Sequence, residues 1–268
     1  MSISKLIEIF SVWRKGWFLR KRLKGYDFGE IVWKSSTGST NQDLLEKSKI
    51  RLKHPSVVIA DHQTAGKGRL ERQWISEKGA ALLMSVSFEV DTSNDLISLF
   101  SMKLSLATLK ALEKLGFRGI KIKWPNDLVV VQNEAPHKLA GVLAQSLIKG
   151  PDAIVVVGLG LNIRIANLRN ILEYDRISAL SELGNPPNVV DLAELILQEL
   201  SETALDGDLL VAEYAKYSHT LGTHVCVDIS GEKFEGFAKA ITQTGSLIVE
   251  TEDGALRQIS VGDIIHLR

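Results

Sequence analysis

The chain of 268 residues is 45% apolar, which is enough for a sizeable core and excludes disorder as its main state. Lys plus Arg and Asp plus Glu both total 32, so no global field draws the protein toward nucleic acid or an acidic surface. The single cysteine, Cys226, excludes an internal disulfide and a cysteine-based zinc site, as expected in a reducing cytoplasm. No apolar run reaches the roughly 20 residues that span a bilayer, so we expect no membrane partner.

Residues 1–30 are predicted to form an N-terminal extension with a short amphipathic helix. Ile3, Leu6, Ile7 and Phe10 recur at helical spacing. A basic segment without any acid follows and contains Arg14, Lys15, Arg20, Lys21, Arg22 and Lys24. We interpret the helix as a surface helix, and weak contact with a membrane or a partner is the alternative.

A hydroxyl-rich turn follows a short strand predicted at residues 31–34. Ser39, Thr40 and Asn41 are candidate N-caps of the next helix. Capping alone would explain these residues. The alternative is that their hydroxyl and amide groups bind a small polar ligand beside the helix N-terminus.

A glycine-rich basic loop follows an apolar strand at residues 57–60. Gly66 and Gly68 alternate with Lys67 and Arg69, and Arg72 comes shortly after. Glycines let backbone N–H groups approach an anion, and the cations can neutralise a phosphate or carboxylate. The loop is not a Walker A motif. A solvated basic turn is the alternative to an anion site.

Strands and helices alternate after this loop. We predict a strand at 80–88, a helix at 95–115, two strands within 119–131 joined by a Pro-Asn-Asp turn, and a polar hairpin tip at 132–137. Lys138 then leads a strand and is expected at the edge of the sheet. The apolar strand at 153–165 contains Asn162, either as a hydrogen-bonded core residue or as a ligand-facing one.

The C-terminal part of the chain is predicted to contain helices followed by short β-strands. Residues 177–183 and 189–217 are predicted to be helical, with a Gly-Asn-Pro-Pro break between them. From about Leu221, five short strands with turn residues between them indicate a small barrel.

Five motifs in this order together resemble the biotin protein ligases. They are Ser39–Asn41, Gln63–Trp74, Lys123–Asp127, Lys138–Leu143 and Gly158–Asn162. The resemblance implies an α+β fold: a class II synthetase-like catalytic domain over residues 31–220, with a mixed sheet flanked by helices, and an SH3-like barrel over 221–268. It implies a cytoplasmic enzyme of the type that lacks the N-terminal DNA-binding domain, so we expect no nucleic-acid partner.

The resemblance also implies a two-step reaction. Biotin and ATP, with Mg²⁺, would give biotinyl-AMP and pyrophosphate, and biotin would then pass to a lysine of the biotin carboxyl carrier protein domain of a carboxylase such as acetyl-CoA carboxylase. Lipoate or octanoyl transfer, and a non-enzymatic biotin-binding module, are the alternatives. No side-chain nucleophile is needed, so Cys226 is expected to be structural. A homodimer is one arrangement compatible with the resemblance.

Site roles are carried over onto matching positions only. Lys138 and Arg69 would be the catalytic cations, with Lys67 and Gly68 closing over the biotin carboxylate and the adenylate phosphate. The remaining binding residues implied are Ser39, Thr40 and Asn41 at the biotin head group, Gln63 at its ureido ring, Trp74 near adenine, Asn162 at the nucleotide or metal, and Gly66, Arg72, Asn126 and Gly141. The metal ligands are not identified.

Two positions depart from the family pattern. Lys67 replaces the usual Arg and loses bidentate phosphate contacts, and Glu71 stands where glycine is commoner. We therefore expect a working enzyme that holds its adenylate less tightly.

Overall fold

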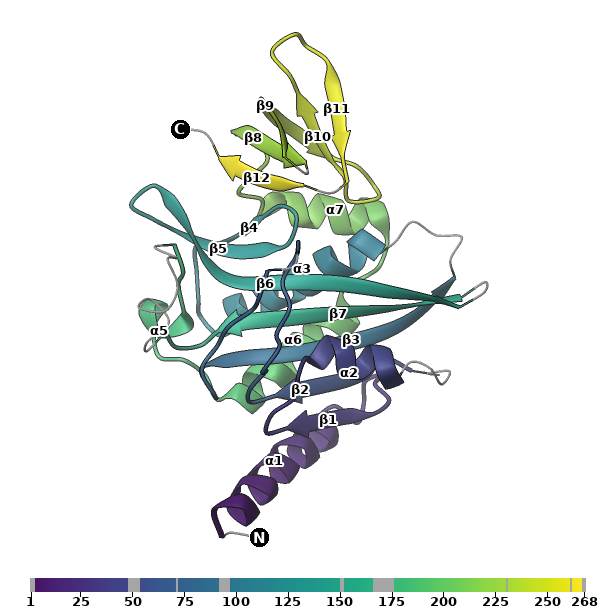
Figure 1. Cartoon of the computed structure of the whole chain (residues 1–268), viewed down its shortest axis with the longest axis vertical. Coiled ribbons are helices and arrows are strands. Elements are labelled where there is room, and N and C mark those ends of the chain that lie inside the picture. Colours follow the sequence, from purple (N-terminus) through teal and green to yellow (C-terminus); the bar gives the residue numbers. More distant parts are fainter. Residues whose placement is uncertain are drawn as a thin grey trace.

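The structure is a computed structural model. It describes residues 3–47, 54–70, 72–91, 97–149, 152–165, 176–229, 231–260 and 262–266. Seven strands form a mixed sheet in the spatial order β1-β2-β3-β7-β6-β5-β4 (Figure 1). They are β1 (Ile31–Lys34), β2 (Ser56–Ala60), β3 (Ala81–Asp91), β4 (Ile120–Lys123), β5 (Asp127–Gln132), β6 (Ala135–Lys149) and β7 (Asp152–Asn162). Among the strands that the structure describes in this sheet, only β1 and β2 pair in parallel and the other neighbours are antiparallel, which confirms the predicted α+β class.

Helices cover both faces of this sheet. On one face lie α3 (Ile97–Lys114) and α6 (Val189–Glu202), with α7 (Gly207–Lys216) packed against α3, and on the other lies α2 (Thr40–Lys47). Successive side chains of β7 point to opposite faces of the sheet. Val155 and Val157 join the main core, whereas Ile154 and Val156 pack with Leu44 of α2. The even-numbered positions of β7 therefore face the α2 side.

Three predicted boundaries are wrong. The hairpin tip is not residues 132–137, because β5 and β6 pair to their ends and leave only Asn133 and Glu134 in the turn, at φ 49° and 62°. Such a tight turn suits a long twisted hairpin. The helix at 189–217 is two helices, because Asp206 caps α7 by accepting a hydrogen bond from the Leu209 N–H at 2.9 Å. Only Leu180–Leu183 (α5) is helical within 177–183.

A second, five-stranded antiparallel sheet follows in the order β11-β10-β9-β8-β12. Its strands are β8 (His224–Ile229), β9 (Glu232–Ile241), β10 (Leu247–Glu250), β11 (Leu256–Ile259) and β12 (Asp263–His266). Ile259 of the first edge strand and Ile264 of the last share one core, so the sheet curls around it. Trp124, from the β4–β5 turn, lies in that core and donates its indole N–H to the Gly245 carbonyl at 3.0 Å. This tryptophan fastens the second sheet to the first.

The N-terminal helix α1 spans Ile3–Arg22, within the segment where the sequence predicts a helix. It packs on β1 and α6, at the sheet edge remote from the second sheet, and buries Leu19 (Figure 1). Among the helices that the structure describes, none has the length and apolarity needed to cross a bilayer.

Candidate active site

A cavity of about 300 Å³ opens on the α2 face of the large sheet. It gathers every sequence-predicted site residue except Gly66: Ser39, Thr40, Asn41, Gln63, Lys67, Gly68, Arg69, Arg72, Trp74, Asn126, Lys138, Gly141 and Asn162. Motifs separated by more than 100 residues therefore meet in one place. We call the side formed by Ser39–Asn41 and Gln63 the neutral wall, and the side formed by Lys67, Arg69, Arg72 and Lys138 the cation wall.

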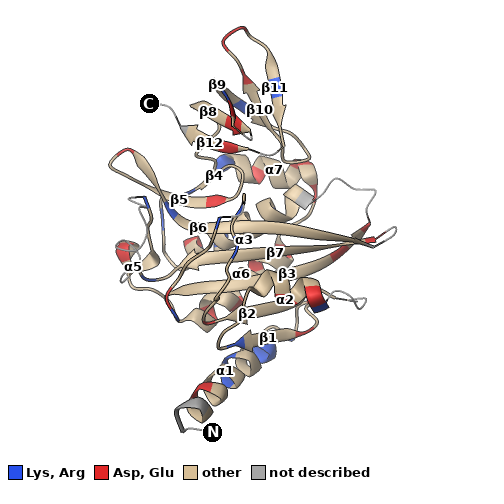
Figure 2. Ribbon diagram, in the orientation of Figure 1, with Lys and Arg blue, Asp and Glu red and all other residues tan. Residues whose placement is uncertain are grey.

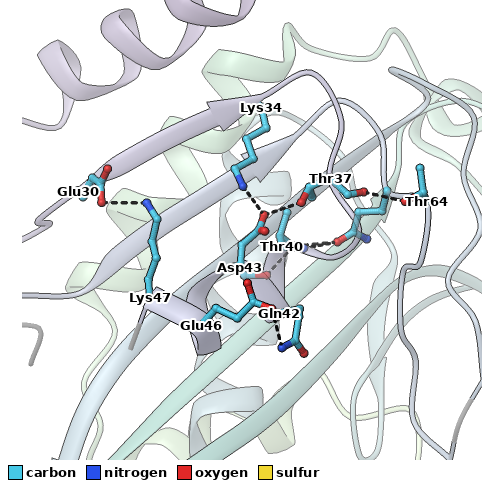
Figure 3. Close-up of polar contacts among 11 residues, drawn as sticks. Glu30, Lys34, Thr37, Thr40, Gln42, Asp43, Glu46, Lys47 and Thr64 are labelled. Atoms are coloured by element: carbon cyan, nitrogen blue, oxygen red, sulfur yellow. Dashed lines mark hydrogen bonds and ion pairs between the residues drawn. The ribbon is translucent and has the colours of Figure 1, made fainter. Parts of the chain in front are cut away.

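The neutral wall begins at the N-terminus of α2. Asp43, in the first turn of this helix, accepts a hydrogen bond from the Thr37 hydroxyl at 2.7 Å and pairs with Lys34 at 3.0 Å (Figure 3). A carboxylate at this position is favoured by the positive end of the helix dipole. These contacts fix the turn that carries Ser39 and Thr40 beside β1.

A chain of hydrogen bonds connects the rest of the neutral wall. The Thr40 hydroxyl lies 2.6 Å from the Ser85 hydroxyl, which donates to Asn41 Oδ1 at 2.6 Å. Asn41 Nδ2 donates to Gln145 Oε1 at 2.9 Å. The amide of Asn41 fits because position 158 is glycine: a Cβ there would lie 2.2 Å from Asn41 Oδ1. Thr40 and Asn41 are thus held in this wall by neutral groups.

Gln63 joins the same network in a defined orientation. Its Oε1 accepts the backbone N–H of Thr40 at 2.7 Å. Because a backbone N–H can only donate, the contact assigns the oxygen of the amide to this side. Gln63 Nε2 is therefore the end that remains as a donor.

The glycine-rich loop folds back on itself. Lys67 and Gln73 form an antiparallel bridge, and the Trp74 N–H donates to the Gly66 carbonyl at 2.9 Å. Gly66 does not line the cavity. A Cβ at this position would lie 2.5 Å from the Trp74 carbonyl oxygen, so this glycine permits the close approach of the two loop strands. Glu71 lies outside the described residues.

Trp74 forms the floor between the two walls. A Cβ at Gly160 would lie 2.4 Å from its Cε2, so only glycine leaves room for the indole. The Lys138 ammonium lies 5.7 Å from the ring centroid, at cation–π distance. The buried indole N–H has no hydrogen-bond partner among the described residues, which leaves a donor in a polar cavity.

Lys138 was predicted at the edge of the sheet, and this is wrong. It lies on β6, which pairs with β5 and β7, and its backbone N–H and C=O bond at 2.8 Å to Arg176 and Ser178. A bulge shifts the β5–β6 register here, so that Lys138 and Gly141 both face the cavity although three residues apart. Lys138 Nζ forms an ion pair with Asp127 Oδ1 at 2.7 Å, outside hydrogen-bond geometry.

The second sheet contributes to the cation wall. Arg72 pairs with Asp263 of β12, and Arg69 donates to the Gly262 carbonyl at 3.2 Å and to Asn126 Oδ1 at 3.4 Å. Burial lowers the pKa of the Arg69 guanidinium from its ordinary value, and the carboxylates of Asp263 and Asp127 oppose that shift.

Some cavity residues were not predicted as site residues. Asp127 was interpreted only as a turn residue, although it closes the Lys-Trp-Pro-Asn-Asp motif. Asp263 lies in the last strand, where no local pattern distinguishes it from a surface acid. Asn162 lines the cavity, and its Nδ2 donates to the Ser178 carbonyl at 3.0 Å, so it is hydrogen-bonded as one interpretation expected; contact with a ligand stays a prediction.

Two protein-family models match this chain. The Biotin/lipoate A/B protein ligase family matches residues 33–162, and the fold is that of a ligase of this class. The Biotin protein ligase C terminal domain matches residues 220–267. The biotin--[acetyl-CoA-carboxylase] ligase of Mycobacterium tuberculosis is 32% identical over 262 residues, covering 93% of this chain and 94% of that protein. The chain belongs to the biotin protein ligase family.

Other relatives agree with this assignment. The bifunctional ligase/repressor BirA of Escherichia coli is 27% identical over 273 residues, covering 96% of this chain and 83% of that protein. Among solved structures, the biotin protein ligase from Aquifex aeolicus in complex with biotin and ATP shares the fold, with a TM-score of 0.65 at 24% identity over 90% of this chain and 100% of that one.

Proposed function

We propose that this biotin protein ligase activates biotin with ATP and transfers it to a lysine of the carrier domain of a biotin-dependent carboxylase. The observation that supports this most directly is the meeting of a neutral wall and a cation wall over Trp74 in one cavity. A neutral, hydrogen-bonding head group and a charged phosphate need these two environments at adjacent positions.

The first step joins two anions. A carboxylate oxygen of biotin attacks the α-phosphorus of ATP, the bond from that phosphorus to the bridging oxygen breaks, and pyrophosphate leaves with the electron pair. Lys138 is the catalytic cation in this proposal, because a compact ammonium can contact both the carboxylate and the α-phosphate. Asp127 pairs with Lys138 in the absence of substrates, and the substrates would replace Asp127 as the partner of its ammonium.

The neutral wall would hold the biotin head group. Gln63 Nε2 is the remaining donor on an amide whose oxygen is already bonded to Thr40, so it suits the ureido carbonyl. The hydroxyl of Ser39 and the amide of Asn41 extend the same surface. Because these groups are held by one another, little ordering accompanies binding.

The cation wall would hold the phosphates. Lys67, Arg69 and Arg72 surround the cavity, and phosphate oxygens would replace the carboxylate and carbonyl partners of the arginines. Trp74 would pack near the adenine.

Mg²⁺ fits this cavity as an ion held mainly by ATP. Among the described residues, no three His, Cys, Asp or Glu side chains gather into a metal cage, and Mg²⁺ commonly uses one or two carboxylates together with substrate phosphates. Asp127 and Asn162 would supply the protein oxygens. The bound ion would neutralise charge on the polyphosphate.

In the second step, the carrier lysine attacks the acyl carbon of biotinyl-AMP. A new amide forms, AMP leaves, and the amine loses its proton. The relative from Mycobacterium tuberculosis acts, by its name, on acetyl-CoA carboxylase, and we propose a carrier domain of that kind as the partner here.

Pyrophosphate release with ATP, Mg²⁺ and labelled biotin, with and without an apo carrier domain, tests the proposal. We expect biotin-dependent pyrophosphate release and label on the carrier. Activity with lipoate or octanoate in place of biotin would overturn the substrate assignment. Biotin binding without pyrophosphate release would instead indicate a binding module.

A further inference from the structure

The helix α1 plays no part in the cavity and precedes both family matches, the first of which begins at residue 33. It projects from the end of the molecule opposite the second sheet (Figure 1). Its inner face buries Gly16, Leu19 and Leu23. These residues recur at three- and four-residue intervals, so one stripe of the helix is used for packing on the body.

Charges on this inner side are already paired with the body. Lys15 binds Asp61 at 2.8 Å, and Arg22 binds Glu194 at 2.9 Å and also Asp191. Glu8, the acid of this helix, pairs with Lys78. The acidic side chain of the helix is therefore already ion-paired with the rest of the protein.

The outer face carries a second stripe, and it is apolar. Leu6, Phe10, Trp13 and Trp17 follow one another at intervals of four, three and four residues, which places them on one side of the helix. Their exposed fractions are 48, 61, 55 and 41%. The rings of Phe10 and Trp13 stack at 6.0 Å, and those of Trp13 and Trp17 at 6.4 Å. Large aromatic side chains in such a continuous exposed row indicate an interaction surface.

Cations flank and continue this stripe. Arg14, Arg20, Lys21 and Lys24 are exposed, and none of them pairs with a carboxylate in the described part of the chain. Lys21 lies over the Trp17 ring at 5.3 Å, and Arg20 reaches only a carbonyl of its own helix. Figure 2 shows the basic residues gathered on α1 in a protein whose net charge is zero.

We propose that the outer face of α1 docks on a membrane surface rich in anionic lipid. Tryptophan and phenylalanine side chains enter the interface between head groups and acyl chains, and unpaired Lys and Arg side chains bind lipid phosphates and carboxylates. A second copy of this chain is a poorer occupant, because pairing two such faces brings cation against cation with no acid on either side. The helix would lie on the membrane, with β1 and α6 above it.

Docking of this kind is compatible with catalysis. The sheet order places β1 at one edge, whereas Lys138 lies on β6, four strands away. The function proposed is attachment of the ligase to a membrane surface, in addition to its reaction. It takes up the membrane contact that the sequence left open for this helix, and it revises our expectation of no membrane partner, which rested on the absence of a spanning run and on the zero net charge.

Vesicle flotation with the full chain tests the proposal. One set of vesicles is pure phosphatidylcholine and the other contains about one third phosphatidylserine. We expect flotation with the anionic vesicles, a blue shift of tryptophan emission, and weaker binding as salt rises. Changing Arg14, Lys21 and Lys24 to Gln should lower the partition coefficient about 100-fold, from roughly a factor of five per cation.

Two further variants make the result specific. Trp13→Ser with Trp17→Ser should abolish binding, and a matched set of exposed lysines elsewhere, Lys121, Lys216 and Lys233 changed to Gln, should not. Thermal unfolding and biotin-dependent pyrophosphate release check that each variant is folded. No flotation of the wild type at low salt would overturn the proposal. So would wild-type binding by the Trp variant, or a concentration-dependent dimer that the Trp variant abolishes.

Discussion

The two walls of the cavity are held by different kinds of contact. On the neutral wall, Thr40 and Asn41 bond to Gln63, Ser85 and Gln145, all uncharged groups at 2.6–3.0 Å. On the cation wall, Lys138 is held by Asp127, and Arg72 is held by Asp263, a residue of the other sheet.

This difference has a consequence for binding. Hydrogen bonds between neutral groups are insensitive to salt and keep their geometry in the absence of ligand, so the neutral wall selects by shape. The ion pairs of the cation wall can be exchanged for phosphate, so this wall selects by charge and responds to ionic strength. Five substitutions test that contrast.

The largest effect is expected for Lys138→Ala. Loss of a cation that contacts the reacting groups should lower the rate of biotinyl-AMP formation about 100- to 1,000-fold. Single-turnover pyrophosphate release measures this rate. Lys121→Ala, at an exposed lysine of β4, is the control and should be unchanged. An effect on KM alone would assign Lys138 to binding and not to catalysis.

Gly160→Ala should displace Trp74, which lies between the two walls. The new Cβ would lie 2.4 and 2.6 Å from two ring carbons, so the indole must move. We expect a free energy of unfolding lower by about 1–3 kcal/mol, together with a marked loss of activity. Gly25→Ala is the matched control, because its Cβ meets nothing within 4 Å. Equal unfolding curves for the two variants would contradict this packing.

Thr40→Val removes a hydroxyl from the neutral wall and keeps its size. We expect the KM for biotin to rise about tenfold, the equivalent of one lost hydrogen bond of about 1.4 kcal/mol. The salt dependence of the KM for ATP should not change.

Arg72→Ala should leave the KM for biotin unchanged and should make the KM for ATP less dependent on salt. If both variants changed the same parameter, the two walls would not act separately.

The smallest effect is expected for Lys67→Arg. A planar guanidinium can make bidentate phosphate contacts that an ammonium cannot, so dissociation of biotinyl-AMP should slow by a few fold. Release of labelled adenylate from the two proteins measures this. Unchanged dissociation would show that Lys67 does not contact the phosphate.

The five motifs were sufficient to predict most of the residues that line the cavity. Each motif occupies a turn or a strand end where the residue types indicate their local role. Glycines allow a close approach of the backbone, and hydroxyl side chains can cap a helix N-terminus. Asp263 could not be predicted, because its role depends on a contact between Arg72 and a strand 191 residues later. The domain boundaries at residues 30 and 220 stay predictions.

The sequence by itself determined most of the helices and strands and the order of the motifs, because periodicity and turn chemistry are local properties. The fold class and the composition of both walls followed from the resemblance of those motifs to the biotin protein ligases. Tertiary structure alone decided which groups hold Lys138, why positions 158 and 160 must be glycine, and which stripe of α1 remains exposed. The physical reason is that close contacts between distant segments depend on strand register and packing. A bulge in β6 turns Lys138 toward the cavity, and the motif that contains this lysine gives no sign of it.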